Sequence, residues 1–206
     1  MASTTRSRGA PTARRQAIEA SLLEATEELL EEGLAFSELS VEKIARRAGI
    51  SRTAFYFYFA DKRELLIRLT EDVNALILEQ ANLWWEHDGE PADRVRQALE
   101  NSLAIHREHA LLLRAVAEAA TSDEEVAEHR RLLLARVAEV TEGHVRGENA
   151  AGRTRCEDPA ATALALTWMT DAAFLQLEQG SGSTPGDREL VNALTAIWVR
   201  SIYLSD

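Results

Sequence analysis

The sequence predicts an all-α protein of about nine helices. Ala, Leu, Glu and Arg, which favour helices, dominate its 206 residues. Gly and Pro, which interrupt helices, are missing from two long stretches, residues 50–88 and 92–142. No alternating run of β-branched residues indicates a strand. A chain of this length is expected to form one or two domains.

The first four helices are bounded by residues that typically cap or end a helix. Good N-cap residues precede the second, third and fourth helices: Ser40, Ser51 and Asp61. Glu64 follows Asp61 with the spacing of a capping box, and Gly33 and Gly49 are suitable helix ends. The predicted helices therefore cover residues 12–32, 41–48 and 51–57, and a long segment that begins at Asp61.

The remaining helices are bounded in the same way. Ser122 and Glu125 have capping-box spacing and predict the start of the seventh helix, which ends near Gly147. Asp158 followed by Pro159 is a favourable helix start, and Thr184 with Pro185 has the same pattern. The five predicted helices run from Pro91 to about 107, over 110–120, from about 122 to 147, from Pro159, and from Pro185 to about 204.

The last two predicted helices are apolar on all sides. Asp171 is the only charged residue between Pro159 and Leu177, and Arg200 is the only one between Leu190 and Ser205. A helix at the surface of a protein needs only one apolar stripe, which faces the core. Each of these two helices therefore has a second apolar face that must be covered by something else. Pairing these helices with their copies would give an isologous four-helix interface in a homodimer. The alternative is an internal helical hairpin in a monomer.

Charge is distributed unevenly along the chain. The formal net charge is −11, yet residues 1–62 contain nine basic and nine acidic side chains. The whole negative excess therefore lies in the C-terminal two thirds. This asymmetry is typical of an N-terminal module that faces a polyanion. Residues 1–12 are expected to form a disordered basic arm.

Several classes of protein are disfavoured by simple absences. No apolar run approaches the roughly 18 residues of a membrane span, and no apolar segment follows the N-terminal arginines as in a secretory signal. The single cysteine, Cys156, predicts no internal disulfide and a cytoplasmic location. No Glu-x-x-His pair suits a helical di-iron site, so no metal, cofactor or catalytic residue is expected. An all-helical enzyme and a dimeric interaction protein without DNA binding remain the alternative hypotheses.

Residues 40–66 contain the pattern of a helix-turn-helix. Ala45 is small where two helices must cross, and Gly49 suits a tight turn with positive φ. In this motif the second helix lies in the major groove of DNA. Any helical hairpin can resemble this pattern, so the turn alone does not establish the motif.

Five consecutive aromatic residues, Phe55–Phe59, strengthen the interpretation. A short helix cannot bury all five, so Phe55 and Phe59 are expected to anchor it while Tyr56 and Tyr58 reach phosphate oxygens. Phe57 fits either group. Lys62 lies in the first turn of the fourth helix, where a cation is unfavourable, and this position favours a bound phosphate over a structural role.

The segment resembles the TetR family of bacterial transcriptional regulators. The resemblance rests on Gly49-Ile50-Ser51, Phe55-Tyr56, Tyr58-Phe59, and Lys62 with Glu64 and Leu65, with Phe55 and Tyr58 replacing the usual Leu and His. It implies a DNA-binding domain over residues 13–60 and a ligand-binding and dimerisation domain over 61–206. It further implies a dimeric repressor that binds a palindromic double-stranded DNA operator and is released by a small, largely apolar effector.

The resemblance also implies roles for single residues. Arg52, Thr53 and Phe57 would face base edges, with Arg52 suited to a bidentate contact with guanine. The residues expected to complete the DNA-binding set are Ser40, Ser51, Tyr56, Tyr58 and Lys62. The candidates for the effector site are Trp168, Met169, Asp171, Phe174 and Trp198, for which plain core or dimer packing is the alternative.

Overall fold

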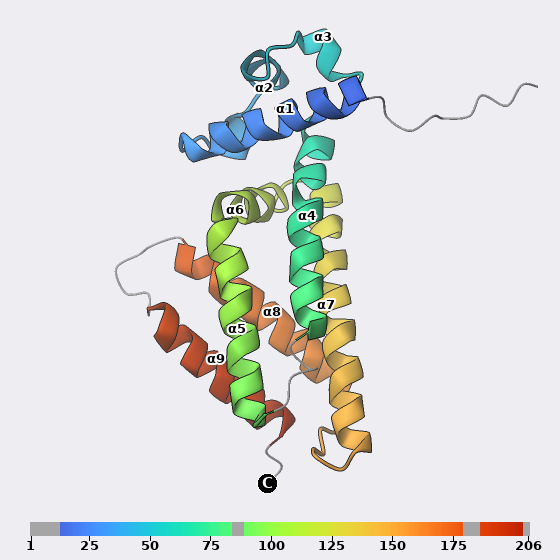
Figure 1. The fold of residues 1–206 in the computed structure, drawn as a ribbon, viewed down its shortest axis with the longest axis vertical. Helices are drawn as coiled ribbons and strands as arrows, with labels where there is room; N and C mark the ends of the chain where they lie inside the picture. Colours follow the sequence, from blue (N-terminus) through green and yellow to red (C-terminus); the bar gives the residue numbers. More distant parts are fainter. Residues whose placement is uncertain (1–12, 84–88, 179–185, 204–206) are drawn as a thin grey trace, which may run out of the picture. The chain divides into compact units, whose positions relative to one another are not determined.

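The computed structural model describes residues 13–83, 89–178 and 186–203, and every regular element within these ranges is helical (Figure 1). The elements are α1 (Ala13–Glu31), the 3-10 helix η1 (Phe36–Glu38), α2 (Val41–Arg47), α3 (Arg52–Phe55), α4 (Lys62–Leu83), α5 (Pro91–Glu108), α6 (Ala110–Ala119), α7 (Glu124–Ala150), α8 (Pro159–Glu178) and α9 (Asp187–Ile202). The all-α prediction is confirmed. The expected basic arm at residues 1–12 lies outside the described ranges.

The chain divides into two compact units, the first ending at Arg68 and the second beginning at Leu69. The division falls inside α4, later in the chain than the domain boundary expected at Asp61. Within the described residues, no helix is both long and apolar enough to cross a membrane.

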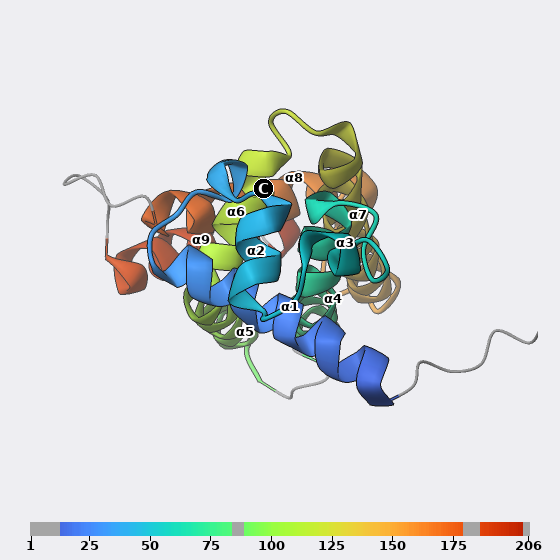
Figure 2. The same cartoon turned by 90° about the horizontal axis from the view of Figure 1, so that it is seen from above.

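The first unit is built from α1, η1, α2, α3 and the start of α4. α2 packs against both α1 and α3, and α2 and α3 lie on the same side of α1 (Figure 1, Figure 2). Ser40 Oγ accepts the amide of Lys43 at 3.2 Å, and Ser51 Oγ accepts that of Ala54 at 3.1 Å, as the N-cap pattern predicts. Gly49 has φ 72° between the two helices, a conformation that a side chain would oppose. The helix-turn-helix geometry therefore follows from local sequence.

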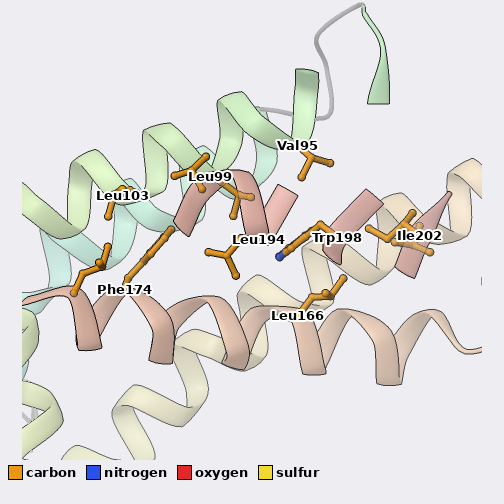
Figure 3. Packing of buried hydrophobic residues seen from close by; sticks show 11 residues of the cluster. Val95, Leu99, Leu103, Leu166, Phe174, Leu194, Trp198 and Ile202 are labelled. Carbon is orange, nitrogen blue, oxygen red and sulfur yellow. The ribbon is translucent and has the colours of Figure 1, made fainter. Parts of the chain in front are cut away.

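The core of the second unit lies between α5, α8 and α9 (Figure 3). α7 packs along α8, and α5 packs along α9. The larger buried side chains in this cluster are Leu99, Leu103, Leu166, Phe174, Leu194, Trp198 and Ile202. Burying several such side chains, each worth about 1.5–3 kcal/mol, holds the helices around the cavity described below.

The predicted start of the seventh helix is wrong. The N-cap of α7 is Asp123, whose Oδ1 accepts the amides of Glu125 and Val126 at 3.1 and 3.2 Å. Ser122 instead hydrogen-bonds the carbonyl of Ala119 at the end of α6. A carboxylate one residue later is the better partner for the positive end of α7, which runs to Ala150 rather than Gly147.

Among the described residues, α9 begins at Asp187. Gly186 is its N-cap residue, and its amide donates to Glu189 Oε2 at 3.1 Å. The expected start at Thr184 and Pro185 lies outside the described residues. At α8 the predicted start is confirmed, since Asp158 Oδ1 accepts the amide of Ala161 at 3.0 Å.

Candidate DNA-binding surface and ligand cavity

α3 is held in place from one side by two aromatic rings. Phe55 and Phe59 are both buried, with ring centroids 5.8 Å apart. The predicted anchoring pair is confirmed. α3 itself ends at Phe55, two residues earlier than expected, and the chain continues through turns to Phe59.

The opposite side of this segment is open. Phe57 is 75% exposed and Tyr56 is 48% exposed, and Arg52 and Thr53 are exposed as well. Tyr58 is half-buried, with the guanidinium carbon of Arg15 5.9 Å from its ring centre. An aromatic ring as exposed as that of Phe57 is costly in water, so this face is suited to being covered by a partner.

Ser40 and Ser51 accept backbone amides as N-caps, but each hydroxyl keeps a proton that it can donate. Both residues are exposed. Their capping role is therefore compatible with the expected phosphate contacts.

Lys62 has a structural role that the sequence did not indicate. Its Nζ donates to the carbonyl oxygens of Phe36 and Ser37, both at 3.0 Å, and of Leu39 at 2.9 Å. The ammonium has three protons, and these three bonds use all of them. Burial lowers the pKa of Lys62 below the ordinary lysine value. The inference that this position favours a ligand over a structural role is wrong, because three carbonyls offset the unfavourable helix dipole.

Another basic side chain near α3 is also engaged within the unit. Arg47 bonds Glu28 at 3.1 Å and Glu32 at 2.7 Å, and these hydrogen bonds raise its pKa. The bonds tie α2 to α1. Arg46, one residue earlier, is exposed.

The second unit contains a largely apolar cavity of about 100 Å³, which is room for several water molecules. Its aliphatic walls come from α4 to α8: Ile77, Ala81, Val95, Ala98, Leu99, Leu113, Val116, Leu133, Leu134, Val137 and Leu175. A cavity of this kind suits a small apolar ligand.

An ion pair lies in the cavity wall. The guanidinium of Arg130 on α7 donates to the carboxylate of Asp171 on α8. Nε2 of His106 lies 4.0 Å from the same carboxylate, and Nδ1 of this ring donates to the carbonyl of Ser102 at 2.9 Å. The ring of His106 also meets Phe174 edge-on, with centroids 5.0 Å apart.

A second polar cluster lines the cavity at the start of α7. Asn74 Nδ2 donates to Nε2 of His129 at 3.0 Å, and Thr70 Oγ1 lies 3.0 Å from the same nitrogen. Because an amide NH₂ group can only donate, Nε2 of His129 accepts from Asn74 and carries no proton, so the imidazole is neutral. Burial, as the largest cause, lowers the pKa of His129 below its ordinary value.

The five effector-site candidates divide into two groups. Asp171, Phe174 and Trp198 line the cavity, and Trp198 Nε1 donates to Thr170 Oγ1 at 3.0 Å. Trp168 and Met169 are not among the lining residues. The Trp168 ring lies 5.4 Å from the guanidinium carbon of Arg130, while Met169 packs against the hydrophobic core.

Sequence reasoning missed most of the polar residues that line the cavity, among them Thr70, Asn74, His129 and Arg130. A usable signal existed in α4, where Thr70 and Asn74 occupy the same stripe as Leu66 and Ile77. Polar residues on an otherwise apolar helix stripe indicate either a buried network or a ligand site. Among the residues that the structure describes, no cluster of three or more His, Cys, Asp or Glu side chains could hold a metal ion.

A capped helix-turn-helix with an exposed aromatic and basic face defines a DNA-binding protein of the helix-turn-helix class. Residues 22–69 match the family of bacterial regulatory proteins called tetR, and residues 95–204 match the C-terminal domain of the transcriptional regulator EthR. The chain belongs to the TetR family of DNA-binding transcriptional regulators, which are not enzymes.

Two relatives illustrate the extent of the similarity. The chain is 30% identical over 191 residues to the HTH-type transcriptional regulator EthR of Mycolicibacterium smegmatis, covering 90% of this chain and 86% of that protein. It is 32% identical over 189 residues to EthR of Mycobacterium tuberculosis, covering 87% and 84%. The fold also resembles that of the fatty acid degradation regulator FadR from Bacillus halodurans, with TM-score 0.68, 14% identity, and 92% and 96% of the two chains covered.

Proposed function

We propose that this protein is a cytoplasmic, ligand-responsive repressor that binds a palindromic operator as a homodimer and is released by a small, largely apolar effector. The observation that carries the proposal is the pairing of an exposed reading face at α3 with an apolar cavity in the second unit of the same chain. A regulator that senses a ligand directly needs both features.

The proposed DNA contacts are supported by the exposure of the side chains concerned. Arg52, Thr53 and Phe57 would meet base edges, with Arg52 as the candidate for bidentate contact with guanine. Ser40, Ser51, Tyr56 and Tyr58 are the candidates for phosphate contacts. Lys62 is left out of this set, because its three protons are engaged within the protein.

Dimerisation through α8 and α9 is supported by apolar side chains that the single chain leaves exposed. Leu164 is 49% exposed and Ile197 is 43% exposed. Two copies joined there would present two reading helices, which must lie about 34–36 Å apart to enter successive major grooves. An effector that prefers a different arrangement by ~1–3 kcal/mol would change DNA affinity about 5–150-fold.

The test is a mobility-shift and footprinting experiment with the DNA upstream of the protein's own gene. A footprint over two symmetric half-sites, lost when an organic extract of the native cells is added, supports the proposal. A protein that binds no fragment at low salt contradicts it and favours the dimeric interaction protein. A footprint over a single half-site contradicts the palindromic operator.

A further inference from the structure

We propose that DNA binding by this protein is sensitive to protons, and that the sensor is the hydrogen bond between Asn74 on α4 and His129 on α7, which protonation of the imidazole breaks. Both residues belong to the second unit. The inference rests on the proposed operator binding and adds the proton as a signal that acts alongside the effector.

The hydrogen bond needs an acceptor that only the neutral imidazole provides. Asn74 Nδ2 lies 3.0 Å from Nε2 of His129, and its amide NH₂ group can only donate. A proton on Nε2 would set two donors against each other at this distance. Thr70 Oγ1, 3.0 Å from the same nitrogen, can remain a partner of the protonated ring because a hydroxyl accepts as well as donates. Protonation therefore removes the bond to Asn74.

The surroundings of the ring oppose protonation. Burial is the largest cause, Glu71 on α4 acts in the opposite sense, and Arg136 on α7 again disfavours the charged ring, so that the pKa of His129 lies below its ordinary value. The contact is therefore fully present above about pH 6.5, the ordinary histidine pKa, and weakens progressively as the pH falls below it.

The other helices around the cavity offer the protonated ring no free anion among the described lining residues. Asp171 on α8 is the only acidic one, and it is bonded to Arg130. The lining residues of α6, Leu113 and Val116, are apolar, and the only titratable one on α5 is His106. A protonated ring thus gains no carboxylate partner from the cavity wall to replace the lost bond.

α4 carries the effect toward the DNA-binding unit, because the division between the two units falls inside this helix, between Arg68 and Leu69. Asn74 lies within the next two turns, and further along α4 the side chain of Gln80 accepts from Asn101 on α5 at 3.2 Å. Loss of the Asn74 contact leaves the part of α4 that follows the division less firmly held. A dimer must order that part to place its reading helices about 34–36 Å apart, and this ordering reduces DNA affinity.

The test measures the affinity for an operator duplex by fluorescence anisotropy at pH 8.0 and pH 5.5 and at one salt concentration. His129→Gln keeps a side chain that can accept from Asn74 but takes up no proton in this range. On acidification the wild type is expected to lose at least about threefold more affinity than His129→Gln. A released imidazole of ordinary pKa is protonated about ten to one at pH 5.5, which bounds the effect at roughly tenfold for each protomer.

His109→Gln is the matched control, since it removes a histidine of the second unit that does not line the cavity. It is expected to lose as much affinity on acidification as the wild type. Asn74→Asp replaces the donor with a carboxylate of the same shape, which accepts from the protonated ring. Acidification is expected to weaken this variant no more than His129→Gln.

A second measurement follows the His129 ring by NMR in the protein without DNA, where it is expected to titrate below pH 6.5 in the wild type and above it in Asn74→Asp. Equal losses of affinity by the wild type and His129→Gln would overturn the inference, and this is the result expected if the Asn74 amide turns over to accept from the protonated ring. A ring that titrates at or above pH 6.5 in the wild type would overturn it as well. A protein that binds no DNA at pH 8.0 contradicts the proposed function itself, so the two failures are distinct.

Discussion

Lys62 donates from Nζ to the carbonyl oxygen of Leu39 at 2.9 Å, which joins the first turn of α4 to the residue before the N-cap of α2. Phe36 contributes both a carbonyl acceptor and a ring whose centre is 5.0 Å from Nζ. The contacts hold the η1 turn, and with it the start of the helix-turn-helix, against α4. Lys62 is therefore a positioning residue for the DNA-binding surface.

Lys62→Met should lower the free energy of unfolding by about 2–3 kcal/mol, since hydrogen bonds from a charged donor are lost and several carbonyls lose their partner. Urea denaturation measures this loss. At a temperature where the variant is folded, DNA affinity should fall while the slope of log K against log salt stays unchanged. Loss of a phosphate contact would instead reduce the slope by about one unit. Arg46→Met, a change at an exposed basic residue of α2, serves as the control for stability.

Phe57 and Phe55 provide a matched pair. Phe57→Ala should change stability by less than about 0.5 kcal/mol because its side chain is exposed, yet it should weaken DNA binding. Phe55→Ala should cost about 3–5 kcal/mol in stability because it removes a fully buried ring. Chemical denaturation and fluorescence anisotropy on an operator duplex measure the two effects. Normal DNA binding by the Phe57 variant would remove this residue from the reading face.

Arg52→Ala should cost about 1–3 kcal/mol of DNA-binding free energy at a single base position and relax specificity there. Its side chain is exposed at the start of α3. Binding to a set of duplexes with single base changes measures the preference. A base preference identical to that of the wild type would show that Arg52 does not read a base.

Stability should fall as the pH drops below about 6.5, the ordinary histidine pKa, because the lowered pKa of His129 makes the folded protein bind fewer protons than the unfolded chain. Above that pH the group is neutral in both states and contributes no pH dependence. Urea denaturation at pH 8.0 and 5.5 gives the difference. His129→Gln should show a smaller difference than the wild type, and an equal one would contradict the assignment.

Leu164→Glu combined with Ile197→Glu should convert the proposed dimer into a monomer, because charges would be buried at the interface. Light scattering after size-exclusion chromatography measures the mass. Leu132→Glu is the control, since Leu132 is also exposed but lies on α7. A double variant that remains dimeric would place the interface elsewhere.

The features that could be predicted from the sequence are those that depend on local interactions. Caps such as Ser40 and Ser51, the turn at Gly49 and the apolar spacing of the helices need only neighbouring residues, and the structure confirms them. The burial of Phe55 and Phe59 was predictable for the same reason, because their spacing places both on one side of a short segment.

Contacts between residues far apart in the sequence could not be predicted, because they depend on how the helices pack. Lys62 reaches carbonyls more than twenty positions away, and Arg130 meets Asp171 across 41 positions. Asp171 lines the cavity while Trp168, three residues before it, does not. No local pattern contains such contacts, because they arise only when packing of the apolar faces sets the rotation of each helix.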